Sequence, residues 1–423
     1  MMQAGFAKVD ITPVLGGQKI GWITPIPIAS IADPLYARVA VFVSGEERLG
    51  FVQLDTLSVR WSTVQEIRRQ VEAAGGLPGR NLMVAATHNH SGPAVATVCD
   101  VARDDAYLAW MIPRVTAAVG AAVAALEAAE IGFAAVPEFG LTHNRRTALR
   151  DGTTTTHGLG FRHPLALYVE GPIDPEVAVL AARRPDGAWL GVVLNFACHP
   201  VHRGGEPVVT AGFPGVLAAA LAERGCPQCV FLNGACGNLS PGDPQQPVQP
   251  SMEDIGRRLA EDAFKAIETM TFQAEVSLGA RQVTVQLPYR QLSDDEIRGT
   301  VCGAQRFVDP TAYDRAMPAL LERIRSRGTQ PAEVQVLRLG DVTYTSVPAE
   351  LFVQLGLRIK EAAYPRHGLV VTHANGMVGY VPHQEAFARG GYETTFGPAW
   401  RLAPDAGELL VAAATDLLQP FRT

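Results

Sequence analysis

The chain has 423 residues, of which 47% are hydrophobic and 18% are charged, and its formal net charge at pH 7 is −6. This length and composition fit a globular protein with a large hydrophobic core. The mild negative charge argues against a partner that is a nucleic acid or an anionic membrane, since such partners favour basic stripes, so we expect no nucleic-acid partner.

The N-terminal residues contain no basic region followed by an apolar stretch, so we expect no signal peptide and a cytoplasmic location. The longest uncharged apolar run, Val115–Leu126, is too short to cross a bilayer and is broken by Gly120. It predicts an interior helix, and we expect no transmembrane segment. The six cysteines are expected to be free thiols. Cys226 and Cys229 form a lone C-x-x-C pair to which the sequence assigns no role.

Hydrophobic patterning in the N-terminal part predicts a buried strand that ends in two histidines. We expect strands at Val9–Pro13, Ala37–Val43, Leu49–Leu54 and Met83–Ala86, and a helix at Ser62–Ala74. The last strand leads into Thr87-His88-Asn89-His90-Ser91-Gly92-Pro93. Because side chains alternate faces along a strand, His88 and His90 should project to the same side. They can bind a metal together, or one can bind it while the other transfers protons; alternatively, both hydrogen-bond to backbone carbonyls.

The middle of the chain repeats this pattern of a buried strand that ends at a histidine. After a predicted helix over Asp105–Ala129, the adjacent Arg145 and Arg146 follow Asn144 in a loop, which suits either a solvated surface or a clamp for an oxyanion or carbonyl. The strand Leu190–Phe196 then leads to His199, just before a proline. The strand Cys229–Leu232 leads into a Gly-rich loop, 233–242, whose free N–H groups allow a substrate to approach. That loop lacks the spacing and lysine of a phosphate-binding loop.

The C-terminal part is predicted to contain strands and helices, with one carboxylate, Glu350, at a junction between a strand and a helix. Residues 288–330 are more charged and helical, and we interpret them as an excursion from the main layer. A predicted hairpin, 334–347, ends near Glu350, which is either a helix-start carboxylate or a ligand. Further elements are expected at Leu351–Ala363, Leu369–Thr372 and Pro404–Leu418. No internal repeat or linker is evident, which predicts one domain over residues 1–423.

The alternation of strands and helices, with some hairpins, predicts an α/β fold with a large mixed β-sheet flanked by helices on both faces; the strand order stays open. Three predicted strands end at a potential ligand: His88, His199 and Glu350. Sites in open α/β sheets gather at strand ends. Two histidines and a carboxylate, with one position left for water, form a catalytic zinc set. The sequence therefore predicts a metallohydrolase with one Zn²⁺.

Several motifs resemble those of the neutral/alkaline (non-lysosomal) ceramidases, over nearly the whole chain. The matching segments are Val9-Asp10-Ile11-Thr12-Pro13, Thr87–Pro93, Asn195-Phe196-Ala197-Cys198-His199-Pro200, Asn233-Gly234-Ala235-Cys236-Gly237-Asn238-Leu239-Ser240-Pro241, Pro348-Ala349-Glu350, Asn375-Gly376 with Gly379-Tyr380, and Gly391-Tyr392-Glu393. Each motif alone is weak, and their order along the chain makes the set specific.

The resemblance implies a zinc-dependent amide hydrolase with the fold of the ceramidase catalytic domain. It implies zinc ligation by His88, His199, Glu350 and Tyr380. It places His90, Tyr392 and Arg145 beside the metal, where they contact the substrate or the transition state, and makes Ser240 a substrate contact. Further substrate-binding positions are expected at Asn144, Asn233, Gly234 and Asn238.

The chain departs from the family in ways that bear on the substrate. The family loop usually reads Gly-Asp-Val-Ser-Pro, whereas this chain has Asn238 in place of the aspartate. We expect neither the signal peptide nor the C-terminal β-sandwich domain of the secreted ceramidases. These differences favour a small soluble N-acyl substrate over a lipid. The alternatives are a true ceramidase acting on N-acylsphingosine and a non-catalytic, metal-containing binding protein. A homo-oligomer is compatible with the sequence.

Overall fold

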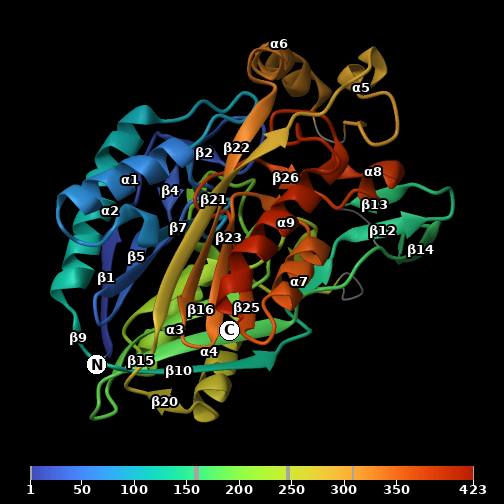
Figure 1. Ribbon diagram of the computed structural model, residues 1–423. Helices are drawn as coiled ribbons and strands as arrows, with labels where there is room; N and C mark the ends of the chain where they lie inside the picture. The colour runs from blue at the N-terminus through green and yellow to red at the C-terminus, as the bar shows by residue number, and fades with distance from the viewer. Residues whose placement is uncertain (1, 157–161, 244–247, 307–308, 423) are drawn as a thin grey trace.

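Most strands of the computed structural model, which describes residues 2–156, 162–243, 248–306 and 309–422, belong to three large sheets (Figure 1). The first sheet has the order β7-β6-β5-β1-β9, with bounds Leu82–Ala86, Glu47–Leu54, Tyr36–Ser44, Met2–Asp10 and Glu127–Ala128. The second has the order β18-β16-β15-β10-β20, with bounds Cys229–Asn233, Trp189–Phe196, Glu176–Arg183, Glu130–Pro137 and Phe272–Gln273. The third has the order β21-β22-β23-β25, with bounds Leu278–Pro288, Thr329–Leu339, Val342–Val347 and His367–Thr372.

Six longer helices lie on these sheets in pairs, as Figure 1 shows. They are α1 (Trp61–Ala73), α2 (Asp105–Ala124), α3 (Gly212–Glu223), α4 (Met252–Glu268), α7 (Val353–Ala362) and α9 (Ala406–Leu418). The pairs α1/α2, α3/α4 and α7/α9 cover the first, second and third sheets, respectively. The predicted α/β class, with mixed β-sheet and flanking helices, is therefore confirmed. The strands divide among several sheets rather than one, since long twisted sheets tend to split into packed ones.

The three sheets share one topology among the described residues. In each, two consecutive antiparallel strands are followed by a helix and by a strand parallel to the second one. The units are β5-β6-α1-β7, β15-β16-α3-β18 and β22-β23-α7-β25. The expectation of no internal repeat is therefore wrong at the level of topology. Many apolar sequences satisfy the same strand pattern, so the repeat leaves little trace in the residue types.

The inner faces of the sheets meet in a central hydrophobic core. Along β5, Ala40 and Phe42 face this core, while Val39 and Val41 face the helices, as strand alternation requires. The central core joins side chains from all three sheets, for example Phe51 of β6 and Tyr344 of β23, whose ring centroids are 4.9 Å apart. Strand ends from different sheets are therefore held rigidly beside one another.

Helix α2 is the one described helix that is long and apolar enough to cross a membrane by length and composition. In the structure it packs on β1, β5 and α1, and Val115 and Val119 are fully buried in the core that it shares with them. It ends at Ala124, before the expected Ala129, and residues 127–128 form β9 instead. All six cysteines are free thiols, as expected.

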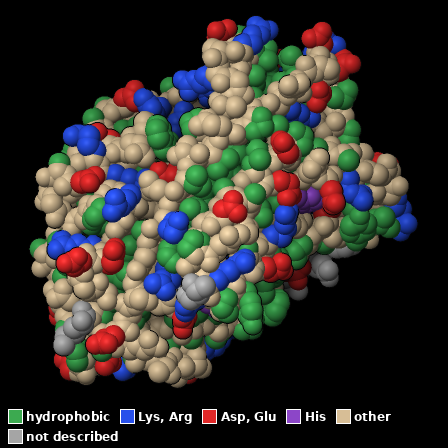
Figure 2. Space-filling view, viewed as in Figure 1, with side chains coloured by type: hydrophobic (Ala, Val, Ile, Leu, Met, Phe, Trp, Pro, Cys, Tyr) green, Lys and Arg blue, Asp and Glu red, His purple; other side chains and the backbone are tan. Residues whose placement is uncertain are grey.

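The remaining described elements form loops and small sheets around the strand ends. Residues between β21 and β22 carry α5 (Asp294–Arg298) and α6 (Pro310–Arg327), which Figure 1 shows at the top, away from the other helices. The small strands are β2 (Gln18–Ile20), β3 (Ile26–Pro27), β4 (Ser30–Ile31), β8 (Gly92–Pro93), β11 (Thr142–Asn144), β12 (Arg146–Leu149), β13 (Thr154–Thr156), β14 (Ala166–Val169), β17 (Val208–Val209), β19 (Leu239–Pro241), β24 (Glu350–Leu351) and β26 (Tyr380–Val381). Short helices are α8 (Ala386–Arg389), Gly79–Asn81, Tyr392–Thr394 and Gln419–Phe421. Positive and negative side chains are interspersed over the face in Figure 2.

Candidate functional site

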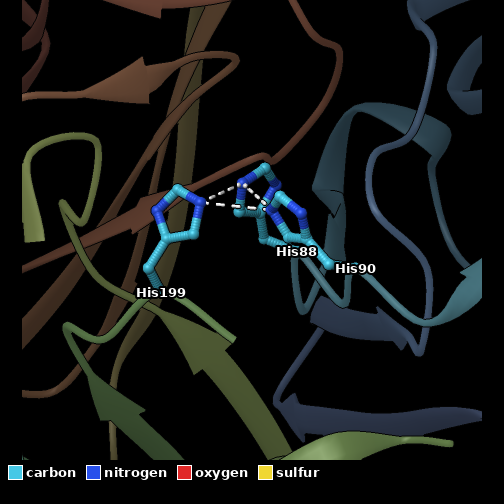
Figure 3. A group of neighbouring side chains, drawn as sticks. All are labelled: His88, His90 and His199. Atoms are coloured by element: carbon cyan, nitrogen blue, oxygen red, sulfur yellow. Dashed lines mark hydrogen bonds between the residues drawn. The ribbon is translucent and has the colours of Figure 1, made fainter. Parts of the chain in front are cut away.

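Three histidines that are far apart in the sequence point their Nε2 atoms at one another, as Figure 3 shows. The Nε2 atoms of His88 and His199 are 3.1 Å apart, those of His90 and His199 are 3.2 Å apart, and those of His88 and His90 are 3.3 Å apart. His88 and His199 are buried, whereas His90 is half-buried. We call these three residues the histidine triad.

Backbone carbonyls fix the tautomer of every ring in the histidine triad. The Nδ1 atoms of His88, His90 and His199 lie 2.8, 2.9 and 3.1 Å from the carbonyl oxygens of Leu57, Gly21 and Cys236. A carbonyl only accepts, so each Nδ1 carries the proton, and in the neutral ring each Nε2 presents a lone pair. Hydrogen bonds from the histidines to backbone carbonyls, the alternative to metal binding in the sequence analysis, therefore exist. They are compatible with metal binding, because they involve Nδ1, whereas a metal would bind at Nε2.

A loop, not strand alternation, brings His88 and His90 together. Strand β7 ends at Ala86, and His88 has φ of 68°, in the left-handed region that non-glycine residues seldom adopt. The expected outcome, two imidazoles on one side, is observed, but its predicted reason is wrong. Such a backbone costs on the order of 1 kcal/mol or more and persists where surrounding contacts hold it.

Asn233 holds the two segments that carry the buried histidines. Its Nδ2 donates to the carbonyls of Thr87 and Cys198 at 3.1 and 3.0 Å, and its Oδ1 accepts from the N–H of Cys198 at 3.3 Å. Thr87 precedes His88, and Cys198 precedes His199. Asn233 is fully buried, and these contacts occupy its amide, so they support positioning rather than the substrate binding expected from the sequence.

Glu350 and Tyr380 are paired residues on the adjacent parallel strands β24 and β26. An Oε2 atom of Glu350 lies 3.3 Å from Nε2 of His88. Burial, followed by the nearby Glu350 carboxylate, raises the pKa of Tyr380 well above its ordinary value. The Gly-rich loop packs closely on the backbone of Glu350 at Gly237, where a Cβ would lie 2.4 Å from the carbonyl oxygen of Glu350.

Arg145 and Arg146 are buried and share one carboxylate, Glu393. Nε of Arg145 and Nη1 of Arg146 each donate to Glu393 at 2.8 Å. Arg145 Nη2 also donates to the phenol oxygen of Tyr380 at 3.2 Å. Burial alone would lower the pKa of Arg145, but Tyr380 and Glu393 raise it on balance, so the guanidinium is charged. The solvated alternative is wrong, and Arg145 lies beside the expected metal shell.

His373 is a member of this site that the sequence analysis missed. Its ring stacks on His88 with centroids 3.9 Å apart, and its Nδ1 lies 2.8 Å from Thr372 Oγ1. Its ligand atom lies within 4.8 Å of those of His88 and Glu350. Thr372 is the last residue of β25 and His373 follows it, much as Thr87 and His88 follow β7, and both histidines have positive φ. The same Thr-His pair at the ends of two equivalent strands is the sequence signal that could have identified His373.

The other expected substrate-binding residues make structural contacts. Asn238 accepts from the N–H of Val353 at 2.9 Å and so caps helix α7. Asn144 donates to the carbonyl of Pro172 at 3.0 Å. Gly234 donates its N–H to Phe196 at 2.9 Å. Ser240 is half-buried in β19, opposite residue 143 of β11. For these residues, substrate contact stays a prediction.

A cavity of about 90 Å³ opens above the histidine triad. His88, His90 and Glu350 form part of its lining, together with Tyr380 and Tyr392. Its apolar lining residues include Ile23, Val98, Met377, Trp400 and Trp22, of which Trp22 is 46% exposed. The site therefore combines a polar base with an apolar mouth, which is typical of small-molecule sites.

The donors at the base of this cavity fit a tetrahedral zinc ion. An ion bonded at about 2.0–2.1 Å to two imidazole nitrogens places them about 3.3 Å apart. The separations in the histidine triad and from His88 to Glu350 are 3.1–3.3 Å. Lone pairs this close repel one another unless a cation lies between them. Imidazole and carboxylate donors are those of catalytic zinc sites.

Comparisons with known proteins identify the fold. No protein-family model matches the chain, and no curated protein matches its sequence. Among solved structures, neutral ceramidase from Pseudomonas aeruginosa aligns with a TM-score of 0.76 and 19% identity, over 99% of this chain and 75% of that chain. A ceramidase complexed with C2 aligns with a TM-score of 0.77 and 18% identity, over 100% of this chain and 75% of that chain. The ceramidase-like fold predicted from the motifs is therefore confirmed.

Proposed function

We propose that this chain, which has the fold of the neutral ceramidases, is a zinc-dependent hydrolase that cleaves the C–N bond of an N-acyl compound. The observation that carries the proposal is that the Nε2 atoms of the histidine triad converge, that Glu350 lies 3.3 Å from Nε2 of His88, and that His88, His90 and Glu350 line one cavity. Neutral ceramidase from Pseudomonas aeruginosa and the ceramidase complexed with C2 share this fold; ceramidases are amide hydrolases, and this likeness supports the reaction class.

His88, His199 and Glu350 are the proposed zinc ligands, with Tyr380 beside them. A bound Zn²⁺ would lower the pKa of a coordinated water toward neutrality and polarise the amide carbonyl. His88 and His199 are the two fully enclosed members of the histidine triad, with exposures of 1% each. The hydrogen bonds from their Nδ1 atoms to carbonyls orient both rings and raise the basicity of Nε2.

His90 is proposed to transfer protons. It is the half-buried member of the histidine triad and lines the cavity, so its Nε2 lone pair can reach both an attacking water and a departing amine. Imidazole suits this task because its ordinary pKa lies near neutrality. Its Nε2 also lies at a ligand-like distance from the other two rings, which makes a role as zinc ligand the competing assignment.

Arg145 and Tyr392 are proposed to stabilise the negative charge that develops on the carbonyl oxygen. Tyr392 lines the cavity, and its ring packs against that of Tyr380 with centroids 5.6 Å apart. Arg145 donates to the Tyr380 oxygen and remains charged in its buried position. Fixed donors in a buried site stabilise an oxyanion without having to reorganise during the reaction.

The test measures metal content and amine release together. His88→Ala is expected to lose both bound zinc and hydrolysis. His90→Gln is expected to retain zinc while turnover falls by about 10²–10⁴-fold, the usual contribution of a general acid–base group. Loss of zinc from His90→Gln would instead make His90 a ligand, and full turnover would refute the proton-transfer role.

A substrate panel separates the proposed function from its alternatives. We expect amine release from short N-acyl compounds, whereas preferential release of sphingosine from N-acylsphingosine would identify a true ceramidase. Wild-type protein that binds zinc stoichiometrically but releases no amine from any member of the panel would be a binding protein, and the hydrolase proposal would fail.

A further inference from the structure

A second cavity, of about 290 Å³, adjoins the cavity lined by His88, His90 and Glu350, which we call the metal cavity. Five arginines line this second cavity: Arg60, Arg103, Arg323, Arg327 and Arg401. We call it the arginine cavity. The arginines come from distant parts of the chain. Arg60 immediately precedes α1, Arg323 and Arg327 lie on α6, and Arg401 lies in the loop before α9. Such a gathering of guanidinium groups around one hollow needs a physical reason, because like charges repel.

Few carboxylates balance these charges. Glu333 lines the arginine cavity, but both of its oxygens accept from Nη1 of Arg68, at 2.8 and 2.9 Å. Arg103 pairs with Asp105 on the exposed side. Within the part of the chain that the structure describes, the other four arginines of the cavity form no ion pair with a carboxylate.

Burial and mutual repulsion both act on the half-buried Arg60 and the buried Arg401. Burial, and then Arg323 and Arg103, lower the pKa of Arg60. Burial also lowers the pKa of Arg401 to about 10; Tyr289 opposes this shift, whereas Arg323 and Arg60 add to it. A bound anion would offset both the burial and the mutual repulsion.

The N-terminus of α1 adds a second anion-attracting element. Trp61 and Ser62, the first residues of this 13-residue helix, line the arginine cavity. The helix has no side-chain cap at its N-terminus and no acidic residue in its first turn. The N-terminus of α1, with the positive end of its helix dipole, therefore lies at the wall of the arginine cavity.

The arginine cavity and the metal cavity share three lining residues, Arg60, Met377 and Arg401. The two cavities are therefore adjacent, with these three residues at their common boundary. We propose that the substrate of the metal centre carries an anionic group (a carboxylate, phosphate or sulfate) that binds in the arginine cavity while its amide lies over the histidine triad. This inference rests on the proposed hydrolase function and narrows its substrate class to anionic N-acyl compounds, such as N-acyl amino acids.

The kinetic test compares substrates that differ only in charge. N-acyl glycines are paired with N-acyl glycinamides, and N-acyl phosphoethanolamines with N-acylethanolamines, and kcat/KM is measured from amine release. We expect wild type to prefer the anionic member by at least about tenfold, since hydrogen bonds to charged groups are among the stronger ones. Arg323→Gln should remove most of this preference. Arg325→Gln, which changes an exposed arginine on the same helix outside both cavities, should preserve it.

A binding test that needs no turnover uses inorganic phosphate. Phosphate should raise the melting temperature above that in chloride of equal ionic strength, in wild type and in His88→Ala, and Arg323→Gln should lose the effect. Equal kcat/KM for anionic and neutral partners in wild type would overturn the inference, while hydrolysis itself would leave the proposed function intact. Phosphate stabilisation without charge preference would identify a site for a free anion and would also overturn it. If no amide is hydrolysed, the proposed function fails, whatever phosphate does.

Discussion

Replacing Asn233 with alanine tests whether this residue positions the proposed zinc ligands His88 and His199. The change removes three hydrogen bonds to the backbone of residues 87 and 198 and leaves three buried polar groups without their partner. Each such group costs about 1–3 kcal/mol, so the free energy of unfolding should fall by about 3 kcal/mol or more. Because the lost contacts hold the segments that carry His88 and His199, zinc affinity should fall by about 10–100-fold.

The matched control is Asn195→Ala. Asn195 is also buried, and its Nδ2 donates to the carbonyls of Leu232 and Val370 at 2.8 and 3.0 Å, so it makes no side-chain hydrogen bond to residues 87 or 198. Urea denaturation of the metal-free proteins gives the stability change, which should be of similar size in both variants. Zinc titration against a competing chelator should show weakened binding for Asn233→Ala alone. Unchanged zinc affinity with a raised KM would make Asn233 a substrate contact and refute the positioning role.

Two further predictions concern buried charges. Glu393→Gln should lower the free energy of unfolding by about 3–5 kcal/mol, because two buried arginines lose their shared counter-ion. The control Glu408→Gln, which removes an exposed pair with Arg358, should lower it by at most about 1 kcal/mol. Similar losses for the two variants in urea denaturation would contradict the argument. Burial raises the pKa of Asp55 to about 6, above its unfolded value near 3.9, so the folded state retains a proton that the unfolded chain has lost. The contribution is therefore present below about pH 4 and is lost as the pH rises through 6, by roughly 3 kcal/mol; Asp55→Asn should flatten this slope between pH 4 and 7, and an identical slope would refute it.

The sequence predicted the positions at which strands end in polar residues, and it did so because burial imposes a short-range pattern. The runs before His88 and His199 are apolar and bounded by polar residues and proline, and the structure contains strands at both places. What brings these ends together is long-range packing, which single-segment patterns do not encode. The motifs that resemble ceramidases supplied this missing information for the fold, as the solved structures confirm.

Other features of the site lay beyond sequence reasoning for identifiable reasons. The left-handed backbone at His88 depends on contacts from outside its own segment, so strand periodicity gave the right neighbours for the wrong reason. An asparagine that holds backbone and one that binds substrate look alike in a Gly-rich loop, and only the partners of Asn233 distinguish them. His373 was missed because its relation to His88 follows from topology, in which β7 and β25 are equivalent strands.

The repeated topology would link binding of the proposed zinc ion to the cooperativity of the whole domain. His88 follows the first unit, and the second and third units carry His199 and Glu350, so no unit can complete the proposed ligand set alone. An ion that binds only to the fully docked arrangement stabilises it by mass action, by about 4 kcal/mol at a thousandfold excess over Kd. Slow amide hydrogen exchange should therefore extend across all three sheets when zinc is present, because opening any one of them releases the ion.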